Sequence, residues 1–179
     1  MDAPSFQRIV LIGMMGSGKS TVGKLLAARR GCRYLDNDDD VRALMAREPT
    51  DVMRFGGEGE LHAAEAAAFL RALASTSPVV IAAAAWVVLD DDCAAALRRE
   101  DLVVYLRARP ETLKRRIGSG AGRRRDATDE SWLEARFRER DDLYRRLATA
   151  VVDVDDRSPD LVVELTMAQT GLADVGRAP

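Results

Sequence analysis

Short apolar runs alternate with amphipathic segments along most of this chain. The runs have the length of buried strands, and the segments between them carry apolar residues at helical spacing. Five strands are expected, at residues 8–12, 34–35, 79–83, 102–106 and 151–154. Strands that alternate with helices at this spacing pair in parallel through right-handed crossovers. The pattern therefore predicts an α/β fold, with a five-stranded parallel sheet as the middle layer of a three-layer sandwich.

The helices are expected between those strands. They should occupy residues 19–30, 41–46, 57–73, 90–99 and 132–147, with two more that begin at Pro110 and after Ser158. Proline fits a first helical turn, and serine is a good cap. Residues 117–128 combine glycines and three consecutive arginines with few apolar residues, which predicts a mobile loop. We expect one domain over residues 1–168 and a disordered tail over residues 169–179.

The composition excludes several classes of protein. The 179 residues are 47% hydrophobic and 31% charged, which is the balance of a single globular domain. With 27 Lys and Arg against 29 Asp and Glu, the net charge of −2 gives no bulk positive field for nucleic acid. No window approaches the ~18 apolar residues that span a bilayer. Cys32 and Cys93 are too few for a disulfide framework. We expect a cytoplasmic monomer that acts on a small molecule, with no nucleic-acid or membrane partner.

A phosphate-binding loop follows the first expected strand. The pattern G-x-x-x-x-G-K-[ST] is matched in full by Gly13, Met14, Met15, Gly16, Ser17, Gly18, Lys19 and Ser20, and Thr21 continues into the expected helix. Glycines let successive backbone N–H groups point inward, and the helix adds its positive end. Lys19 would reach the β- and γ-phosphates, and the Ser20 hydroxyl would hold Mg²⁺. The alternative is a plain glycine-rich turn, but the full match in this context favours binding of ATP or GTP.

Two carboxylates follow the second expected strand. Asp36, Asn37 and Asp38 come directly after it, at the end of the sheet where open α/β folds bind ligands. One carboxylate would assist Mg²⁺ while the other accepts a proton from a substrate hydroxyl. The same residues would also make an acidic helix cap. Taken alone, these residues leave both interpretations open.

From residue 8 to residue 165 the chain resembles the shikimate kinase family. Asp36 and Asp38 match its D-x-D pair, and residues 57–65 (GEGELHAAE) correspond to its substrate motif G-E-x-x-F-R-x-x-E. Residues 140–144 (RDDLY) resemble its R-x-P-L-Y, and residues 152–159 (VDVDDRSP) are close to its V-D-T-D-x-x-S-P. The ordered set of later motifs makes this resemblance more specific than the phosphate loop alone.

The resemblance implies a P-loop NTPase-type sandwich with a mobile lid near residues 117–128. It further implies that ATP and Mg²⁺ are the cofactors and that a phosphoryl group is transferred to a hydroxyl of a small metabolite. Catalysis would fall to Asp38 as the base and to Lys19 and Arg123 as charge stabilisers. Ser20 and Asp36 would hold Mg²⁺. Binding roles are implied for Arg116 and Arg157 on the nucleotide side and for Arg140 on the substrate carboxylate.

The chain departs from the family pattern on the acceptor side. His62 stands where the motif has Arg, and Ala84, Ala85 and Trp86 stand on the three glycines that follow the third strand. We include all four among the expected substrate-binding residues. The alternatives are a surface position for His62 and a hydrophobic plug after the strand, and the register of the motif favours the pocket for His62. Alanine at a positive φ would be strained, and the indole of Trp86 is expected to occupy space that substrate uses. The lid lacks the expected proline after Arg123.

Three hypotheses follow for the function. The first is a kinase for shikimate or a close relative. The second is a kinase on the same scaffold for a different small polyol or sugar-like acceptor. The third is a nucleotide-binding relative without catalysis. Retention of the charged residues favours the two kinases.

Overall fold

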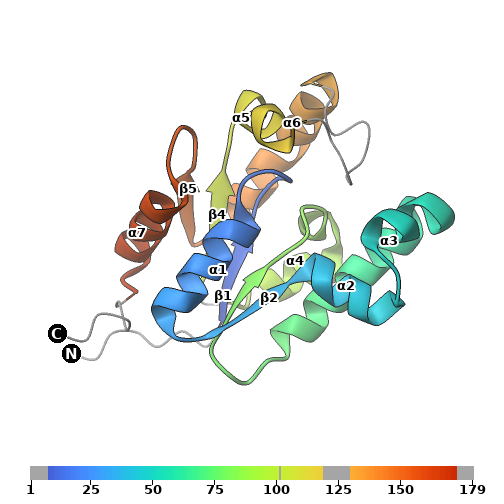
Figure 1. The fold of residues 1–179 in the computed structure, drawn as a ribbon, viewed down its shortest axis with the longest axis horizontal. Coiled ribbons are helices and arrows are strands. Elements are labelled where there is room, and N and C mark those ends of the chain that lie inside the picture. Colours follow the sequence, from blue (N-terminus) through green and yellow to red (C-terminus); the bar gives the residue numbers. More distant parts are fainter. Residues whose placement is uncertain (1–7, 101, 119–129, 173–179) are drawn as a thin grey trace.

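The computed structural model describes residues 8–100, 102–118 and 130–172, and it shows one sheet of five parallel strands (Figure 1). The strand order is β2-β3-β1-β4-β5. The strands are β1 (Arg8–Ile12), β2 (Arg33–Asp36), β3 (Val79–Ala82), β4 (Val103–Arg107) and β5 (Ala150–Asp153). The five strands and their parallel pairing confirm the prediction from the apolar runs.

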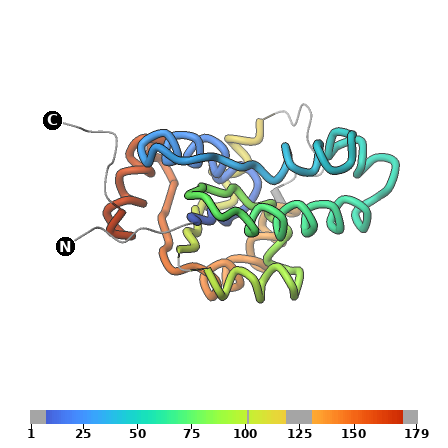
Figure 2. The backbone as a smooth tube through the Cα atoms, turned by 90° about the horizontal axis from the view of Figure 1, so that it is seen from below, coloured from blue at the N-terminus to red at the C-terminus, as the bar shows by residue number. Residues whose placement is uncertain are grey.

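Helices connect the strands and cover both faces of the sheet. Figure 2 shows α1 (Lys19–Arg30) and α7 (Pro159–Thr170) on one face, and α4 (Asp91–Leu97) and α6 (Glu130–Leu147) on the other. The remaining elements are α2 (Asn37–Met45), α3 (Pro49–Leu73), the 3-10 turn η1 (Val87–Leu89) and α5 (Pro110–Ile117). Because helices cover both faces, the central strands are apolar throughout, and Val10, Val103 and Val104 are fully buried.

Two helices begin earlier than the sequence predicted. The expected helix at 41–46 starts at Asn37, because the Asp36 side chain accepts a hydrogen bond from the backbone N–H of Asp38 and caps it. The expected helix at 57–73 starts at Pro49, where proline suits the first turn. Gly57 has φ 79° and breaks α3 into two parts, so the glycine marks a kink rather than a start.

The last helix continues past the predicted domain boundary. Helix α7 runs to Thr170, Gly171 ends it in a left-handed conformation, and Leu172 is buried. Ordered chain therefore extends beyond residue 168. Residues 173–179 of the predicted tail and residues 119–129 of the predicted lid, with Arg123, lie outside the described residues. Within the described ranges, none of the helices has the length and apolar character needed to cross a membrane.

Candidate active site

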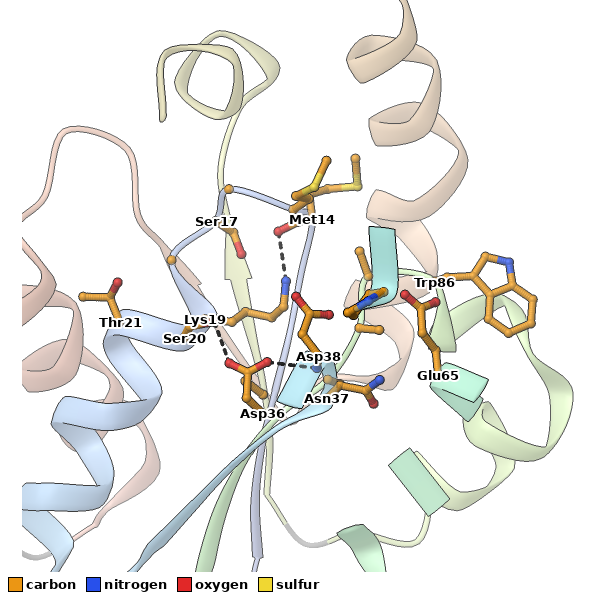
Figure 3. Close-up of a pocket in the computed structure, with 18 of the residues that line it drawn as sticks. Met14, Ser17, Lys19, Ser20, Thr21, Asp36, Asn37, Asp38, Glu65 and Trp86 are labelled. Carbon is orange, nitrogen blue, oxygen red and sulfur yellow. Dashed lines mark hydrogen bonds between the residues drawn. The ribbon is translucent and has the colours of Figure 1, made fainter. Parts of the chain in front are cut away.

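One cavity opens at the carboxyl ends of β1, β2 and β3 (Figure 3). The phosphate loop follows β1, the acidic residues Asp36 and Asp38 follow β2, and residues 83–86 follow β3. Parallel strands bring their carboxyl ends to one edge, so three loops far apart in the sequence meet there. The cavity has a volume of about 1000 Å³, which is large enough for a nucleotide and a second small molecule.

The phosphate loop is shaped by glycines at two tight positions. Gly13 has φ 145°, and a Cβ there would lie 2.6 Å from the carbonyl oxygen of Leu106. Gly18, at φ 97°, precedes the first residue of α1. The Lys19 ammonium donates to the carbonyl oxygens of Gly13 (2.8 Å) and Met14 (3.0 Å). The loop therefore curves around the ammonium, with the start of α1 directed into the cavity.

The hydroxyl of Ser20 and the carboxylate of Asp36 meet at the base of the loop. Ser20 Oγ donates to Asp36 Oδ2 at 2.8 Å, and the Tyr34 hydroxyl donates to the same oxygen at 2.5 Å. Burial, together with the hydrogen bond to Asp36, raises the pKa of Tyr34, so its proton stays in place. Asp36 therefore caps α2, as one of the two interpretations expected, and the same carboxylate also faces Ser20 in the cavity.

The oxygen pair of Ser20 and Asp36 is suited to Mg²⁺. Mg²⁺ prefers hard oxygen ligands and takes most of them from phosphate and water rather than from a protein cage. In the described part of the chain no group of three or more His, Cys, Asp or Glu residues has the arrangement of a metal site. One hydroxyl and one carboxylate beside a phosphate loop match this mode of binding.

Two arginines line the nucleotide side of the cavity. Arg116 donates to the carbonyl oxygens of Ser17 (3.3 Å) and Val154 (2.7 Å), which links the phosphate loop to the segment after β5. Arg157 donates to the carbonyl oxygen of Asp153 at 2.5 Å. Both side chains border the cavity together with Pro159 and Val162. This gives the nucleotide side a charged rim and an apolar wall.

The acceptor side is supported from beneath by α6. Arg140 is only 8% exposed and borders the cavity. The fully buried Tyr144 donates to the carbonyl oxygen of Ala85 at 2.7 Å, and Arg140 reaches the same oxygen at 3.5 Å. Tyr144 also stacks on Tyr105 of β4, with ring centroids 4.8 Å apart. Helix α6 therefore fixes the turn that follows β3.

The two main departures from the family pattern contact each other. The rings of His62 and Trp86 stack with centroids 4.1 Å apart and an interplanar angle of 11°. Figure 3 shows the indole of Trp86 pointing away from Asp38. The indole therefore does not fill the space beside Asp38, although Trp86 borders the cavity and its ring packs on the imidazole of His62.

The expected strain in the turn after β3 is also absent. Among the described residues other than glycine, only Ala46 and Asp156 have positive φ, and Trp86 has φ −83°. None of residues 84–86 has a positive φ, so this turn does not require glycine. The loss of three glycines leaves this backbone unstrained.

Several buried polar atoms of the cavity wall lack a hydrogen bond. Among the described residues, Ser17 Oγ, Arg140 Nε and both side-chain polar atoms of Asn37 are buried without a hydrogen-bond partner. Such atoms are rare in folded proteins, and each costs about 1–3 kcal/mol. All three residues line the same cavity. Their concentration there indicates a site whose polar groups are satisfied by ligands.

The structure brings most of the predicted site residues together. The cavity is lined by Met14 to Thr21, Asp36, Asp38, His62, Ala84, Ala85, Trp86, Arg116, Arg140 and Arg157. Gly13 contributes its carbonyl to Lys19. Sequence reasoning gave no role to Asn37 and Glu65, although both line the cavity and lie within the two quoted acidic motifs. It also missed Tyr34, whose contact with Asp36 has no signature in the sequence.

Comparisons with known proteins agree with this geometry. A family model described as shikimate kinase matches residues 15–170. The shikimate kinase of Chromohalobacter salexigens is 37% identical over 164 residues, which is 90% of this chain and 91% of the relative. That of Streptomyces avermitilis is 38% identical over 89% of this chain and 93% of its own.

Solved structures show the same fold. A shikimate kinase from Acinetobacter baumannii in complex with shikimate has a TM-score of 0.84 at 23% identity, covering 92% of this chain and 93% of its own. A gluconokinase from Sinorhizobium meliloti has a TM-score of 0.65 at 24% identity and covers 93% of both chains. The fold of this chain is thus similar to that of a shikimate kinase and to that of a gluconokinase.

Proposed function

Because the chain belongs to the shikimate kinase family, we propose that it transfers the γ-phosphoryl group of ATP to a hydroxyl of a small metabolite, with shikimate as the first acceptor to test. The observation that carries the proposal is the single cavity that joins the phosphate loop to Asp38 and Arg140. Transfer requires both substrates within one enclosed space, with the reacting oxygen close to the terminal phosphate.

The nucleotide would lie on the loop from Gly13 to Ser20. Its phosphates would accept hydrogen bonds from backbone N–H groups and from Lys19, whose ammonium already lies among the loop carbonyls. Arg116 and Arg157 would line the adenosine side. Ser20 and Asp36 would hold Mg²⁺, which, when bound, neutralises charge on the phosphates.

Asp38 would act as the general base. Its carboxylate borders the cavity next to Lys19 in Figure 3, and it would accept the proton of the attacking hydroxyl as that oxygen bonds to phosphorus. The bond between the γ-phosphorus and the oxygen bridging to ADP breaks in the same step. Lys19 and Arg123 would stabilise the charge that develops on the transferring group.

Arg140 would anchor an acidic acceptor. Its guanidinium is buried at the acceptor side. Its Nε makes no hydrogen bond among the described residues and lies 3.4 Å from Oε2 of Glu139, which is 40% exposed. A buried guanidinium binds a carboxylate strongly and in a fixed orientation. This favours a hydroxy acid over a neutral alcohol as the acceptor.

A different acid or sugar-like acceptor is the second candidate. The observation that favours it is the stacked pair of His62 and Trp86, which puts an imidazole where the family pattern has a permanently charged arginine. A pocket with one guanidinium and an aromatic pair selects acceptors differently from a pocket with two guanidinium groups. One fold carries several such activities, so the scaffold is compatible with both candidates.

We also propose that the enzyme works as a cytoplasmic monomer. The phosphate loop, Asp38 and Arg140 line one cavity of the same chain, which supports a monomer as the working unit. Light scattering of the purified protein with sedimentation of cell extracts checks both statements.

The test is an acceptor screen that detects ADP. The purified chain with ATP and Mg²⁺ is offered shikimate and a panel of other hydroxy acids and polyols, and ADP release above the rate without acceptor is measured. Release with shikimate supports the first candidate, and release with another acceptor alone supports the second. Tight binding of ATP·Mg²⁺ without release for any acceptor would contradict the proposed function and favour a non-catalytic nucleotide-binding protein.

A further inference from the structure

We propose that Asn37 is an acceptor-binding residue, whose side-chain amide hydrogen-bonds a second hydroxyl of the acceptor while its neighbour Asp38 serves the hydroxyl that is phosphorylated. This inference rests on the proposed function and adds one residue to it. The acceptor would be a polyhydroxy acid, with at least one hydroxyl beyond the one that reacts.

The amide of Asn37 has no structural use in the fold. The residue is 3% exposed, and neither Nδ2 nor Oδ1 has a hydrogen-bond partner among the described residues. Asparagine at the start of a helix often caps it, but here the carboxylate of Asp36 already caps α2. A leucine of nearly the same shape would fill the position without leaving polar atoms unsatisfied, so folding alone would favour the apolar residue.

The position of Asn37 assigns it to the acceptor side. It stands between Asp36, which contacts Ser20, and Asp38, and it borders the cavity. Figure 3 shows its side chain directed below Glu65 of α3 and away from Lys19 and the phosphate loop. Both amide atoms are buried, so the contact requires the side chain to rotate about χ1 as well as χ2 when the acceptor binds. A group that reaches it there comes from the acceptor rather than from the nucleotide.

The chemistry of the surrounding groups defines the acceptor class. Arg140 supplies a buried cation for a carboxylate, and Asp38 supplies a proton acceptor for the reacting hydroxyl. A neutral amide offers both a donor and an acceptor, which matches a hydroxyl that keeps its proton. A site built to hydrogen-bond a substrate hydroxyl discriminates strongly against an analogue without it, because its own polar group then stays unpaired.

The test uses Asn37→Leu, which keeps the shape and removes the amide. We expect the melting temperature to stay the same or to rise, because unsatisfied buried atoms are lost. We expect the acceptor KM to rise at least tenfold while the KM for ATP changes less than twofold. Acceptor analogues that each lack one hydroxyl then locate the contact. One analogue should raise the acceptor KM of the wild type but leave that of Asn37→Leu unchanged. The hydroxyl missing from that analogue is the one that contacts Asn37.

The matched control is Thr166→Val in α7. Its hydroxyl is equally buried but is paired, since it donates to the carbonyl oxygen of Val162 at 2.7 Å. This variant should lower the melting temperature and leave the acceptor KM unchanged. The proposal is overturned if Asn37→Leu keeps the wild-type acceptor KM. It is equally overturned if the acceptor KM of Asn37→Leu exceeds that of the wild type by the same factor for every deoxy analogue, because this would indicate a general distortion of the site.

Failure of the proposed function can be told apart from failure of this inference. If the wild type turns over no acceptor, calorimetry with ADP and Mg²⁺ present still measures acceptor binding in both proteins. Binding of a polyhydroxy acid that weakens at least tenfold in Asn37→Leu supports the role of Asn37 without catalysis. Equal binding to both proteins, or none to the wild type, contradicts it.

Discussion

The two halves of the cavity are built by different means. On the nucleotide side, the proposed phosphate donors are backbone N–H groups of one continuous loop. The carbonyl oxygens of Gly13 and Met14 in that loop hold the Lys19 ammonium. On the acceptor side, the cavity is lined by side chains from α2, α3, α6 and the turn after β3. A backbone site is fixed by a short pattern in the sequence, whereas a side-chain site depends on the packing of distant elements. The acceptor half is therefore where this chain can change its substrate without losing its nucleotide.

The largest effect on the use of ATP should come from the nucleotide half. Lys19→Ala removes the charged donor that faces the transferring phosphates, and we expect kcat/KM for ATP to fall about 10²–10³-fold. Steady-state ADP release at varied ATP measures it. The control is Lys114→Ala, which removes an exposed lysine of α5 and should leave the rate unchanged. Wild-type kinetics in Lys19→Ala would contradict the assignment of the phosphate loop.

The second prediction tests whether Arg140 acts on the acceptor half of the cavity alone. Arg140→Lys keeps the charge but loses the two-pronged geometry, and we expect the acceptor KM to rise about 10–100-fold with little change in the KM for ATP. Arg138→Lys, on an exposed position of the same helix, is the control. A change in the ATP KM as large as that in the acceptor KM would show that Arg140 is not confined to the acceptor half.

A smaller effect should come from the aromatic pair. Because the stacked rings of His62 and Trp86 contact each other, their substitutions should not be additive. The double change His62→Arg with Trp86→Gly restores the family pattern at both positions, and we expect kcat/KM for shikimate to rise about tenfold. Each single variant is assayed as its own control. If the double change gives no gain, the lid or the backbone near Ala84 limits shikimate turnover instead.

The smallest effect concerns the support beneath the acceptor half. Burial raises the pKa of Asp141, but hydrogen bonds from Arg145, Tyr105 and Arg107 outweigh it and leave the pKa below its usual range. A carboxylate with a lowered folded pKa stabilises the protein above its unfolded pKa of about 3.9, and this stabilisation is lost as the pH falls through the folded pKa.

Urea unfolding measures this contribution directly. Asp141→Asn should lower the free energy of unfolding by about 1–2 kcal/mol at pH 7 and by less at pH 3, where the wild type has lost part of the same stabilisation. Asp142→Asn, at the exposed neighbouring position, should leave the pH dependence unchanged. An equal loss at pH 7 and pH 3 would show that charge is not the source of the stabilisation.

The same contrast explains how much could be predicted from the sequence. The five strands, the phosphate loop and the pair of Asp36 and Asp38 are local patterns, and each lies where its pattern indicated. The early starts of α2 and α3 were missed because capping by Asp36 and the kink at Gly57 depend on local backbone geometry. Local sequence patterns therefore predicted the strands and their order along the chain, but they did not predict where α2 and α3 begin.

The acceptor side was less accessible to sequence reasoning. His62 and Trp86 stood out as two separate departures, and their stacking became visible only once α3 and the turn after β3 were placed together. The strain expected at Ala84 and Ala85 was inferred from glycines in the family pattern, yet the backbone here needs no positive φ. The buried amide of Asn37 carries no sequence signal, because burial depends on the packing of α2 against its surroundings.

The most direct test of a shared cavity with Asp38 at its centre is acceptor-dependent ADP release by Asp38→Asn. Asparagine keeps the shape but cannot accept the hydroxyl proton, so we expect kcat to fall about 10²–10⁴-fold while ATP·Mg²⁺ binds with wild-type affinity. Release at the wild-type rate from Asp38→Asn would contradict the assignment of Asp38 as the base that couples the two halves of the cavity.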